Sequence, residues 1–118
     1  MSEVQMMVRG YLAQDPRVSQ TNSGRAVGNV LVPHTPRRFN RESGAWEDSG
    51  ATLWVEATVW GDGVDILSGL VKGDEVVVNG TPALEEFERR DGSPGTKLTL
   101  GAASVALVQR KSTRQARQ

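Results

Sequence analysis

The stretch Leu53-Trp54-Val55-Glu56-Ala57-Thr58-Val59-Trp60 alternates in residue type with a period of two. Such alternation predicts a β-strand that has one face in the core and the other toward solvent. The aliphatic positions 53, 55, 57 and 59 form the core face, so Trp54 and Trp60 lie with Glu56 and Thr58 on the opposite face. Burial in the core therefore does not explain the two indoles.

Two interpretations of Trp54 and Trp60 are open. An aromatic ring on an open sheet face offers a surface on which an unpaired base stacks, at roughly 1–3 kcal/mol per base. Alternatively, the indoles pack under a loop or across a subunit interface. We favour stacking, because both side chains share one polar face.

Four further segments have the pattern of strands, over residues 4–12, 26–32, 75–79 and 96–108, the third closed by Gly80 and Pro82. A short helix is predicted over residues 64–70, with Asp62 as its N-cap. In the last strand the apolar phase switches near Gly101, which predicts a β-bulge. Five strands with one helix between the third and fourth is the element order of the all-β OB barrel. Evenly spaced strands could also form a sandwich, but the single helix at this point favours the barrel.

Composition excludes several classes of function. The chain has 118 residues, enough for one domain, with no cysteine and a single histidine. A disulfide framework, a cysteine-ligated zinc and a thiol nucleophile are therefore excluded. No nucleophile elbow, phosphate loop or dinucleotide fingerprint is present. We expect no enzyme activity, cofactor or metal. No long apolar run or signal-peptide core is present, so we expect a cytoplasmic protein without membrane contact.

Charge is unevenly distributed, although the formal net charge is zero. The last ten residues contain Arg110, Lys111, Arg114 and Arg117 and no acid; without these four, the body has 10 basic against 14 acidic residues. We therefore expect an OB domain over residues 1–108 and a short, basic, disordered tail over residues 109–118.

The first long excursion, residues 33–51, mixes cations with aromatic residues around Ser43-Gly44. This composition suits a flap that closes on a nucleic-acid strand, in which the cations meet phosphates and the rings meet bases. A solvated loop is the alternative. The candidate binding residues of this flap are Arg37, Arg38, Phe39, Arg41 and Trp46.

The second excursion, residues 85–95, has a hairpin signal at its tip, Asp91-Gly92. Phe87 is a candidate stacking residue, or else a hydrophobic clip that holds the excursion to the barrel. Arg89 and Arg90 either offset the nearby acids toward phosphate or pair with them. The acids that oppose phosphate binding are Glu56, Glu85, Glu86 and Glu88.

The first strand has a second, mixed face. Such a face on an edge strand is a natural pairing surface between subunits, although the tyrosine could instead stack on a base. The candidate interface residues are Gln5, Met7, Arg9 and Tyr11.

An ordered set of motifs resembles one protein family. The chain from Val4 to Val108 is similar to bacterial single-stranded DNA-binding proteins (SSB), and the 39–46 loop is similar to that of actinobacterial members. The segments that carry the resemblance are Gly10-Tyr11-Leu12-Ala13-Gln14-Asp15-Pro16-Arg17, Gly24-Arg25-Ala26-Val27-Gly28-Asn29, Phe39-Asn40-Arg41-Glu42-Ser43-Gly44-Ala45-Trp46, Thr58-Val59-Trp60, and Val71-Lys72-Gly73-Asp74-Glu75-Val76 with Gly80.

The resemblance implies an OB fold, sequence-independent binding of single-stranded DNA and a homotetramer, with a role in replication, recombination or repair at the nucleoid. The family's main member ends in an acidic tip that docks protein partners, whereas this chain ends in a basic segment. An accessory paralogue or a shortened chain is therefore expected, with replication or repair proteins as possible partners but no acidic tip to dock them.

Two other functions are open. The acidic body favours an oligomeric OB-fold interaction module that binds nucleic acid weakly. An RNA-binding OB domain is also open, because stacking does not distinguish the sugars.

Overall fold

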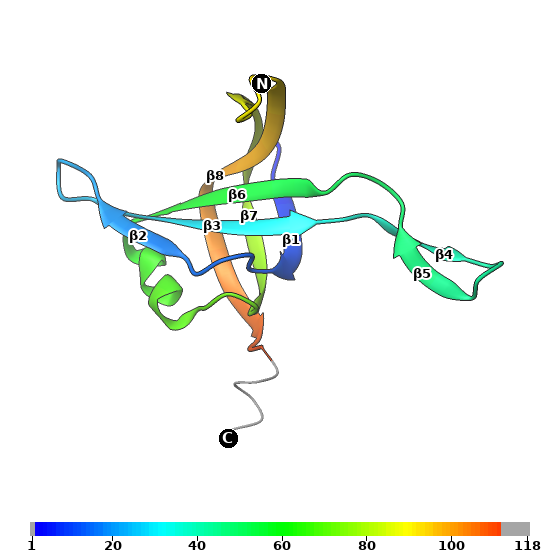
Figure 1. Ribbon diagram of the computed structural model, residues 1–118. Coiled ribbons are helices and arrows are strands. Elements are labelled where there is room, and N and C mark those ends of the chain that lie inside the picture. The colour runs from blue at the N-terminus through cyan, green and yellow to red at the C-terminus, as the bar shows by residue number, and fades with distance from the viewer. Residues whose placement is uncertain (1, 112–118) are drawn as a thin grey trace.

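The computed structural model describes residues 2–111, which form a barrel-like β structure with two arms (Figure 1). The elements in chain order are β1 (Met6–Tyr11), β2 (Arg17–Gln20), β3 (Ala26–His34), β4 (Arg37–Asn40), β5 (Ala45–Asp48), β6 (Leu53–Trp60), the 3-10 helix η1 (Gly61–Gly69), β7 (Glu75–Glu88) and β8 (Pro94–Gln109). Six strands form one sheet in the order β1-β7-β8-β6-β3-β2, and β4 pairs only with β5 in a second sheet.

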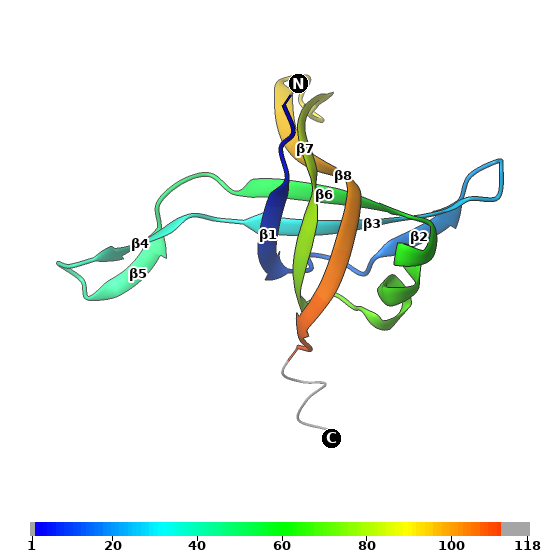
Figure 2. The same cartoon turned by 180° about the vertical axis from the view of Figure 1, so that it is seen from behind.

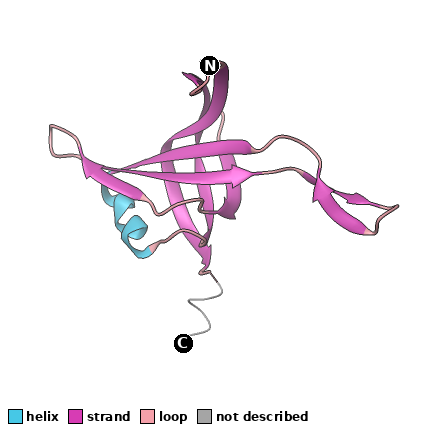
Figure 3. Cartoon of the chain, viewed as in Figure 1, coloured by secondary structure: helices cyan, strands magenta, loops and turns pink. Residues whose placement is uncertain are grey.

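The five predicted strands correspond to β1, β3, β6, β7 and β8, and the helix lies between β6 and β7 as predicted. All neighbouring strands are antiparallel except β6 and β8, which pair in parallel over three residues. Figure 3 shows how little of the chain is helical. Three short strands were not predicted, because β2, β4 and β5 consist of four residues each and have little buried apolar surface.

The core lies on the inner face of the large sheet. In β6, Val55, Ala57 and Val59 are each 1% exposed, which confirms the predicted core face. Leu53 is 43% exposed, because it begins the strand beyond the end of the core. From β7 and β8 the core receives Val76, Val78, Leu98, Leu100, Ala103 and Val105.

A glycine allows the end strand β1 to approach β3 closely. A Cβ on Gly10 of β1 would lie 2.7 Å from Val32 Cγ1 on β3, so only glycine permits this approach. Just beyond β1, the amide of Ala13 donates to the carbonyl of Leu31 at 2.9 Å. The sheet is not closed by a full ladder, but β1 and β3 meet here, and the arrangement is that of the predicted OB fold.

The predicted end of the fourth strand at Gly80 and Pro82 is wrong, because β7 continues to Glu88. The predicted bulge is confirmed, since the β7–β8 register shifts between Asn79 and Thr81, opposite Gly101. Beyond the bulge, β7 pairs with β8 and no longer with β1. A proline without an N–H is tolerated on such a free edge.

The helix plugs one end of the barrel. Leu67 is 2% exposed, and its side chain packs so closely on Gly28 that the glycine has no room for a Cβ. The predicted N-cap at Asp62 is wrong: Trp60 is the capping residue, with no side-chain hydrogen bond, and Asp62 lies in the first turn.

Two motif aspartates fix the loop after this helix. Asp15 accepts a hydrogen bond from the Lys72 amide at 2.7 Å, and buried Asp74 accepts from the amides of Val71 and Lys111, both at 3.0 Å. These bonds tie the end of β1, the loop and the end of β8 together. No helix within residues 2–111 is long and apolar enough to cross a membrane.

Candidate nucleic-acid interface

The outward face of β6 presents both predicted indoles. Trp54 is 48% and Trp60 is 37% exposed. They are six positions apart, which corresponds to about 20 Å along a strand. β6 is paired with β3 on one side and, in its middle, with β8 on the other. The two rings therefore stand at opposite ends of one well-supported strand.

Trp54 lies beside the arm formed by β7 and β8. We use "the arm" for residues 81–99, the part of these strands beyond the bulge together with its tip. A groove of about 600 Å³ separates the start of β6 from the arm, and its lining residues are Leu31, Ala51, Thr52, Trp54, Phe87, Arg89, Thr96 and Lys97. Two predicted stacking residues and one predicted cation thus line the same groove.

Phe87 is held in place by the opposite strand of the arm. It pairs with Gly95 of β8, and a Cβ there would lie 2.7 Å from Phe87 Cζ. The ring therefore covers the glycine and still leaves Phe87 42% exposed. The Arg89 guanidinium lies 5.9 Å from the ring centroid and donates to the Pro94 carbonyl at 2.8 Å.

The acids of this face are partly neutralised by a residue that the sequence analysis missed. Lys97 Nζ lies 3.5 Å from a Glu56 carboxylate oxygen and 3.9 Å from one of Glu85. Lys97 and Glu85 are cross-strand partners in the arm. Finding this pair from the sequence requires the hairpin register, which composition does not give. Lys97 is therefore occupied by acids, and Glu86 and Glu88 lie exposed farther along the arm.

The flap predicted over residues 33–51 contains the β4–β5 hairpin, which extends away from the barrel in both views (Figures 1 and 2). Phe39 and Trp46 are cross-strand partners, and their rings meet edge to face with centroids 5.7 Å apart. They remain 48% and 62% exposed. In this arrangement the hairpin aromatics are not gathered with Trp54 and Phe87.

Two of the three hairpin cations have acidic partners on the same hairpin. Arg37 Nε lies 3.6 Å from Asp48, and its guanidinium also donates to the Trp46 carbonyl at 3.0 Å. Arg38 Nε lies 4.0 Å from Glu47. Arg41, near the tip, forms no ion pair with any residue in the described part of the chain.

Trp60 has a partner that was not predicted. The guanidinium carbon of Arg25, from the β2–β3 loop, lies 4.5 Å from the Trp60 ring centroid. The pairing of Val27 with Trp60 places the start of β3 beside the end of β6. Only this register could have revealed the contact.

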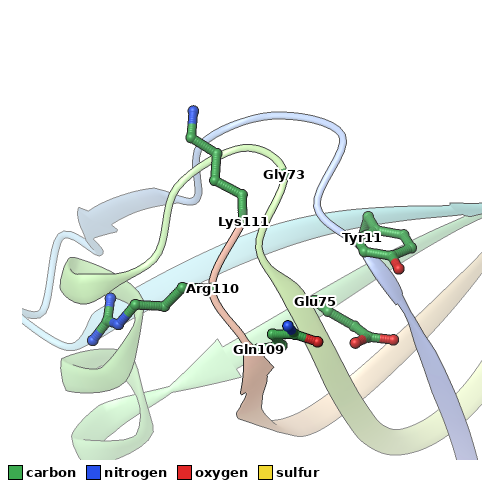
Figure 4. A pocket seen from close by; sticks show the side chains of 6 residues that line it. All are labelled: Tyr11, Gly73, Glu75, Gln109, Arg110 and Lys111. Carbon is green, nitrogen blue, oxygen red and sulfur yellow. The ribbon is translucent and has the colours of Figure 1, made fainter. Parts of the chain in front are cut away.

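The candidate interface residues, three on β1 and Gln5 just before it, share a solvent-facing side, as predicted. Met7 and Tyr11 are 63% and 62% exposed, Gln5 donates to Thr81 at 3.3 Å and Arg9 pairs with Glu75 at 3.1 Å. Figure 4 shows Tyr11 and Glu75 beside the end of β8, around a polar pocket also lined by Gly73, Gln109, Arg110 and Lys111.

The remaining predicted cations lie at the tip of the arm and after β8. Neither Arg89 nor Arg90 forms an ion pair among residues 2–111, but Arg89 supports the arm tip through its hydrogen bond to the Pro94 carbonyl. β8 continues to Gln109, whereas Arg114 and Arg117 of the predicted tail lie outside the described residues. Within that same range, no cluster of His, Asp or Glu could hold a metal ion.

Comparison with known proteins gives one consistent result. The model of the single-strand binding protein family matches residues 4–108. The single-stranded DNA-binding protein of Paenarthrobacter aurescens is 36% identical over 99 residues, which cover 83% of this chain and 57% of that protein. The protein of the same name from Mycolicibacterium smegmatis is 34% identical over 107 residues, 90% of this chain and 64% of that protein. The chain thus spans about three fifths of the length of these relatives.

Solved structures agree with the fold. The crystal structure of the small single-stranded DNA-binding protein from Streptomyces coelicolor superposes with a TM-score of 0.74 at 26% identity, over 92% of this chain and 96% of that chain. An SSB complex with single-stranded DNA from Plasmodium falciparum gives a TM-score of 0.69 at 17% identity, over 92% and 97%. The second likeness supports the fold alone.

Proposed function

Because this chain belongs to the single-strand binding protein family, we propose that it binds single-stranded DNA without sequence preference and without catalysis. Bases stack on Trp54, Trp60 and Phe87, and phosphates meet the nearby cations. Phe39 and Trp46 join when the hairpin closes over the bound strand. Stacking tolerates any sequence, since every base has a flat face.

The observation that carries this proposal is the position of the two indoles on β6. The opposite face of this strand is fully buried from Val55 to Val59, so the backbone beneath the rings is fixed before DNA arrives. Rings held in this way lose little conformational freedom on binding, which favours affinity. Both indoles are exposed on this face, so their rings are accessible to bases.

Phosphate contacts should contribute less to the affinity than base stacking does. Lys97, Arg37 and Arg38 already have acidic partners, which leaves Arg25, Arg41, Arg89 and Arg90 as the cations of the proposed surface without an acidic partner among residues 2–111. We therefore expect a shallow dependence of affinity on salt, because each phosphate contact on a single strand adds about 0.7 to the slope. Deleting residues 109–118 should lower affinity mainly at low salt and leave fluorescence quenching at saturation intact.

A titration with oligo-dT, followed by tryptophan fluorescence, tests the proposal. A stacked indole loses emission, so binding should quench the signal to a plateau. Oligo-rU in the same assay separates DNA from RNA preference. A chain that shows no quenching and no binding to either polymer is instead the interaction module without nucleic-acid affinity.

The proposal includes self-association. The exposed β1 face formed by Gln5, Met7, Arg9 and Tyr11 is the proposed contact, and a homotetramer would place four stacking surfaces on one DNA strand. Light scattering at micromolar concentration should give four times the chain mass. A monomer would contradict this part of the proposal while leaving DNA binding untouched.

In the cell, the proposed role is protection of exposed single strands during replication, recombination or repair, in company with the proteins of those processes. A fluorescent fusion should then follow the nucleoid and concentrate where strands are exposed. A uniform distribution after DNA damage would contradict this role.

A further inference from the structure

We infer that Arg25 binds phosphate and, with Trp60, forms a one-nucleotide subsite at the end of β6 that lies away from the groove. This inference rests on the proposed function. It concerns a residue outside the aromatic set and adds a second anchoring point about 20 Å from Trp54.

The side chains of the pair are already in contact. The Arg25 guanidinium carbon lies 4.5 Å from the Trp60 ring centroid, well within the range of a cation–π interaction. Trp60 nevertheless remains 37% exposed. The guanidinium lies over one part of the ring, and the exposed remainder of the indole is available to a base.

The backbone of Arg25 is fixed by its own loop. Its carbonyl accepts from the Thr21 amide at 2.9 Å, and its amide donates to Thr21 Oγ1 at 3.2 Å. Gly24 just before it has a φ of +85°, which the turn requires. These bonds fix the backbone of Arg25 near the end of β6. In a flexible loop the guanidinium would have no defined position.

The Arg25 guanidinium has no acidic partner within residues 2–111. No carboxylate in the described part of the chain pairs with it, and its guanidinium makes no hydrogen bond there. Arg37 and Arg38 on the hairpin differ, since both have acids within 4.0 Å. All five guanidinium N–H donors of Arg25 are therefore free for an anion.

Together these features match the two parts of one nucleotide, since Trp60 can stack on the base and Arg25 can bind the phosphate. A base stacked on the exposed part of Trp60 carries its phosphate one sugar away, so a cation held on the same ring lies within reach of that phosphate. Arginine suits this place better than lysine, because its planar fork can stay on the ring and bind phosphate oxygens with two parallel hydrogen bonds.

The test separates phosphate contact from support of the indole. Arg25→Gln removes the charge, Arg25→Lys keeps it, and Lys72→Gln is the control: Lys72 is exposed in the loop after η1, not on the outward face of β6 and β3, and it forms no ion pair within residues 2–111. Each variant is titrated with oligo-dT and with an abasic oligonucleotide of the same length, at 50 and 200 mM salt. Thermal melts establish that each variant is folded.

Arg25→Gln should weaken binding of both oligonucleotides by about eightfold at 50 mM salt and about threefold at 200 mM, as the loss of one phosphate contact predicts. Quenching at saturation should persist, and Arg25→Lys should keep the salt slope. The control should change affinity less than twofold.

The other outcomes separate the two proposals. If the unaltered chain binds oligo-dT and Arg25→Gln binds it equally well, the subsite is overturned and the proposed function stands. A loss confined to oligo-dT would overturn the phosphate role and leave Arg25 a support of the indole. An unaltered chain that binds neither oligonucleotide would overturn both.

Discussion

The two arms of this molecule differ in how they are joined to the barrel. The arm of residues 81–99 is a continuation of β7 and β8, so its register is inherited from the core sheet. The β4–β5 hairpin is a separate two-stranded sheet, connected by two short links. These links are tied mainly to each other, through Thr35 and Thr52 hydroxyls 2.6 Å apart and a bond from the Ser49 amide to the Pro36 carbonyl.

The two arms also differ in whether their aromatic side chains lie next to the other candidate stacking residues. Phe87 stands over Gly95 in the groove that also contains Trp54, whereas Phe39 and Trp46 face each other on a projecting hairpin. A hairpin that closes on DNA must lose conformational freedom as it binds, which lowers the net contribution of its contacts. We therefore expect the barrel and its arm to dominate affinity.

The strongest test removes both indoles of β6. Trp54→Ala and Trp60→Ala should each weaken oligo-dT binding by roughly 1–3 kcal/mol. Their separation of about 20 Å makes the losses nearly additive in the double variant. Unchanged affinity in the double variant, with an unchanged melting temperature, would show that the β6 face is not the binding surface.

The second test sets one arm against the other. Phe87→Ala should cost roughly 1–3 kcal/mol in binding, and Trp46→Ala about 1 kcal/mol or less, because its ring already packs against Phe39. Both affinities come from competition with labelled oligo-dT, which does not depend on tryptophan emission. A larger loss for Trp46→Ala would reverse the comparison and make the hairpin the principal clamp.

A subtler change tests placement without deleting a ring. Gly95→Ala puts a methyl group 2.7 Å from Phe87 Cζ, so the ring must leave its position. Displacing a side chain in this way costs about 1 kcal/mol, and affinity should fall by a similar amount. Gly50→Ala is the control, since its nearest contact would be an ordinary 3.6 Å to Pro36. Equal affinities for the two variants would mean that Phe87 needs no precise placement.

The smallest effect concerns the tip of the arm. The pKa of Asp91 is lowered, first by the Ser93 hydroxyl that donates to it and then by the Ser93 amide. Because the carboxyl pKa is lowered on folding, the ionised Asp91 stabilises the folded tip at pH values above its ordinary pKa of about 3.9. This stability is lost as the pH falls through the pKa of the folded state. The protection factor of the Ser93 amide, which corrects for the intrinsic pH dependence of exchange, should therefore fall below about pH 4, with β6 unaffected. Ser93→Ala should raise the pKa toward its ordinary value.

The core strands could be predicted because their side-chain period is strong. The β6 boundaries match the alternating stretch residue for residue, and Gly101 marked the bulge through the change of apolar phase. The continuation of β7 through Pro82 was missed, since the breaking tendency of proline was weighed without knowing that this edge has no partner. The short polar strands had no periodic signal.

The site was predicted in its residue types but not in its pairings. The aromatic candidates all lie on exposed positions, yet the link between Glu56 and Lys97, and that between Arg25 and Trp60, join residues about 35 to 41 positions apart. Such pairs depend on strand register, which is set by the whole sheet. Sequence alone also could not show that Arg37 and Arg38 already have acidic partners.

The continuity of β7 and β8 has a consequence for how the chain folds. Residues 75–109 form one long hairpin around the Asp91-Gly92 turn, with a bulge at Asn79–Thr81, and it contains both arm and barrel strands. Contacts near the turn close short loops, whereas β1 must find β7 across some seventy residues. We expect this hairpin to assemble early and to serve as the template on which β6 and β1 dock. Destabilising changes at Leu100 should then slow refolding, and those at Val8 should mainly accelerate unfolding, as stopped-flow kinetics can determine.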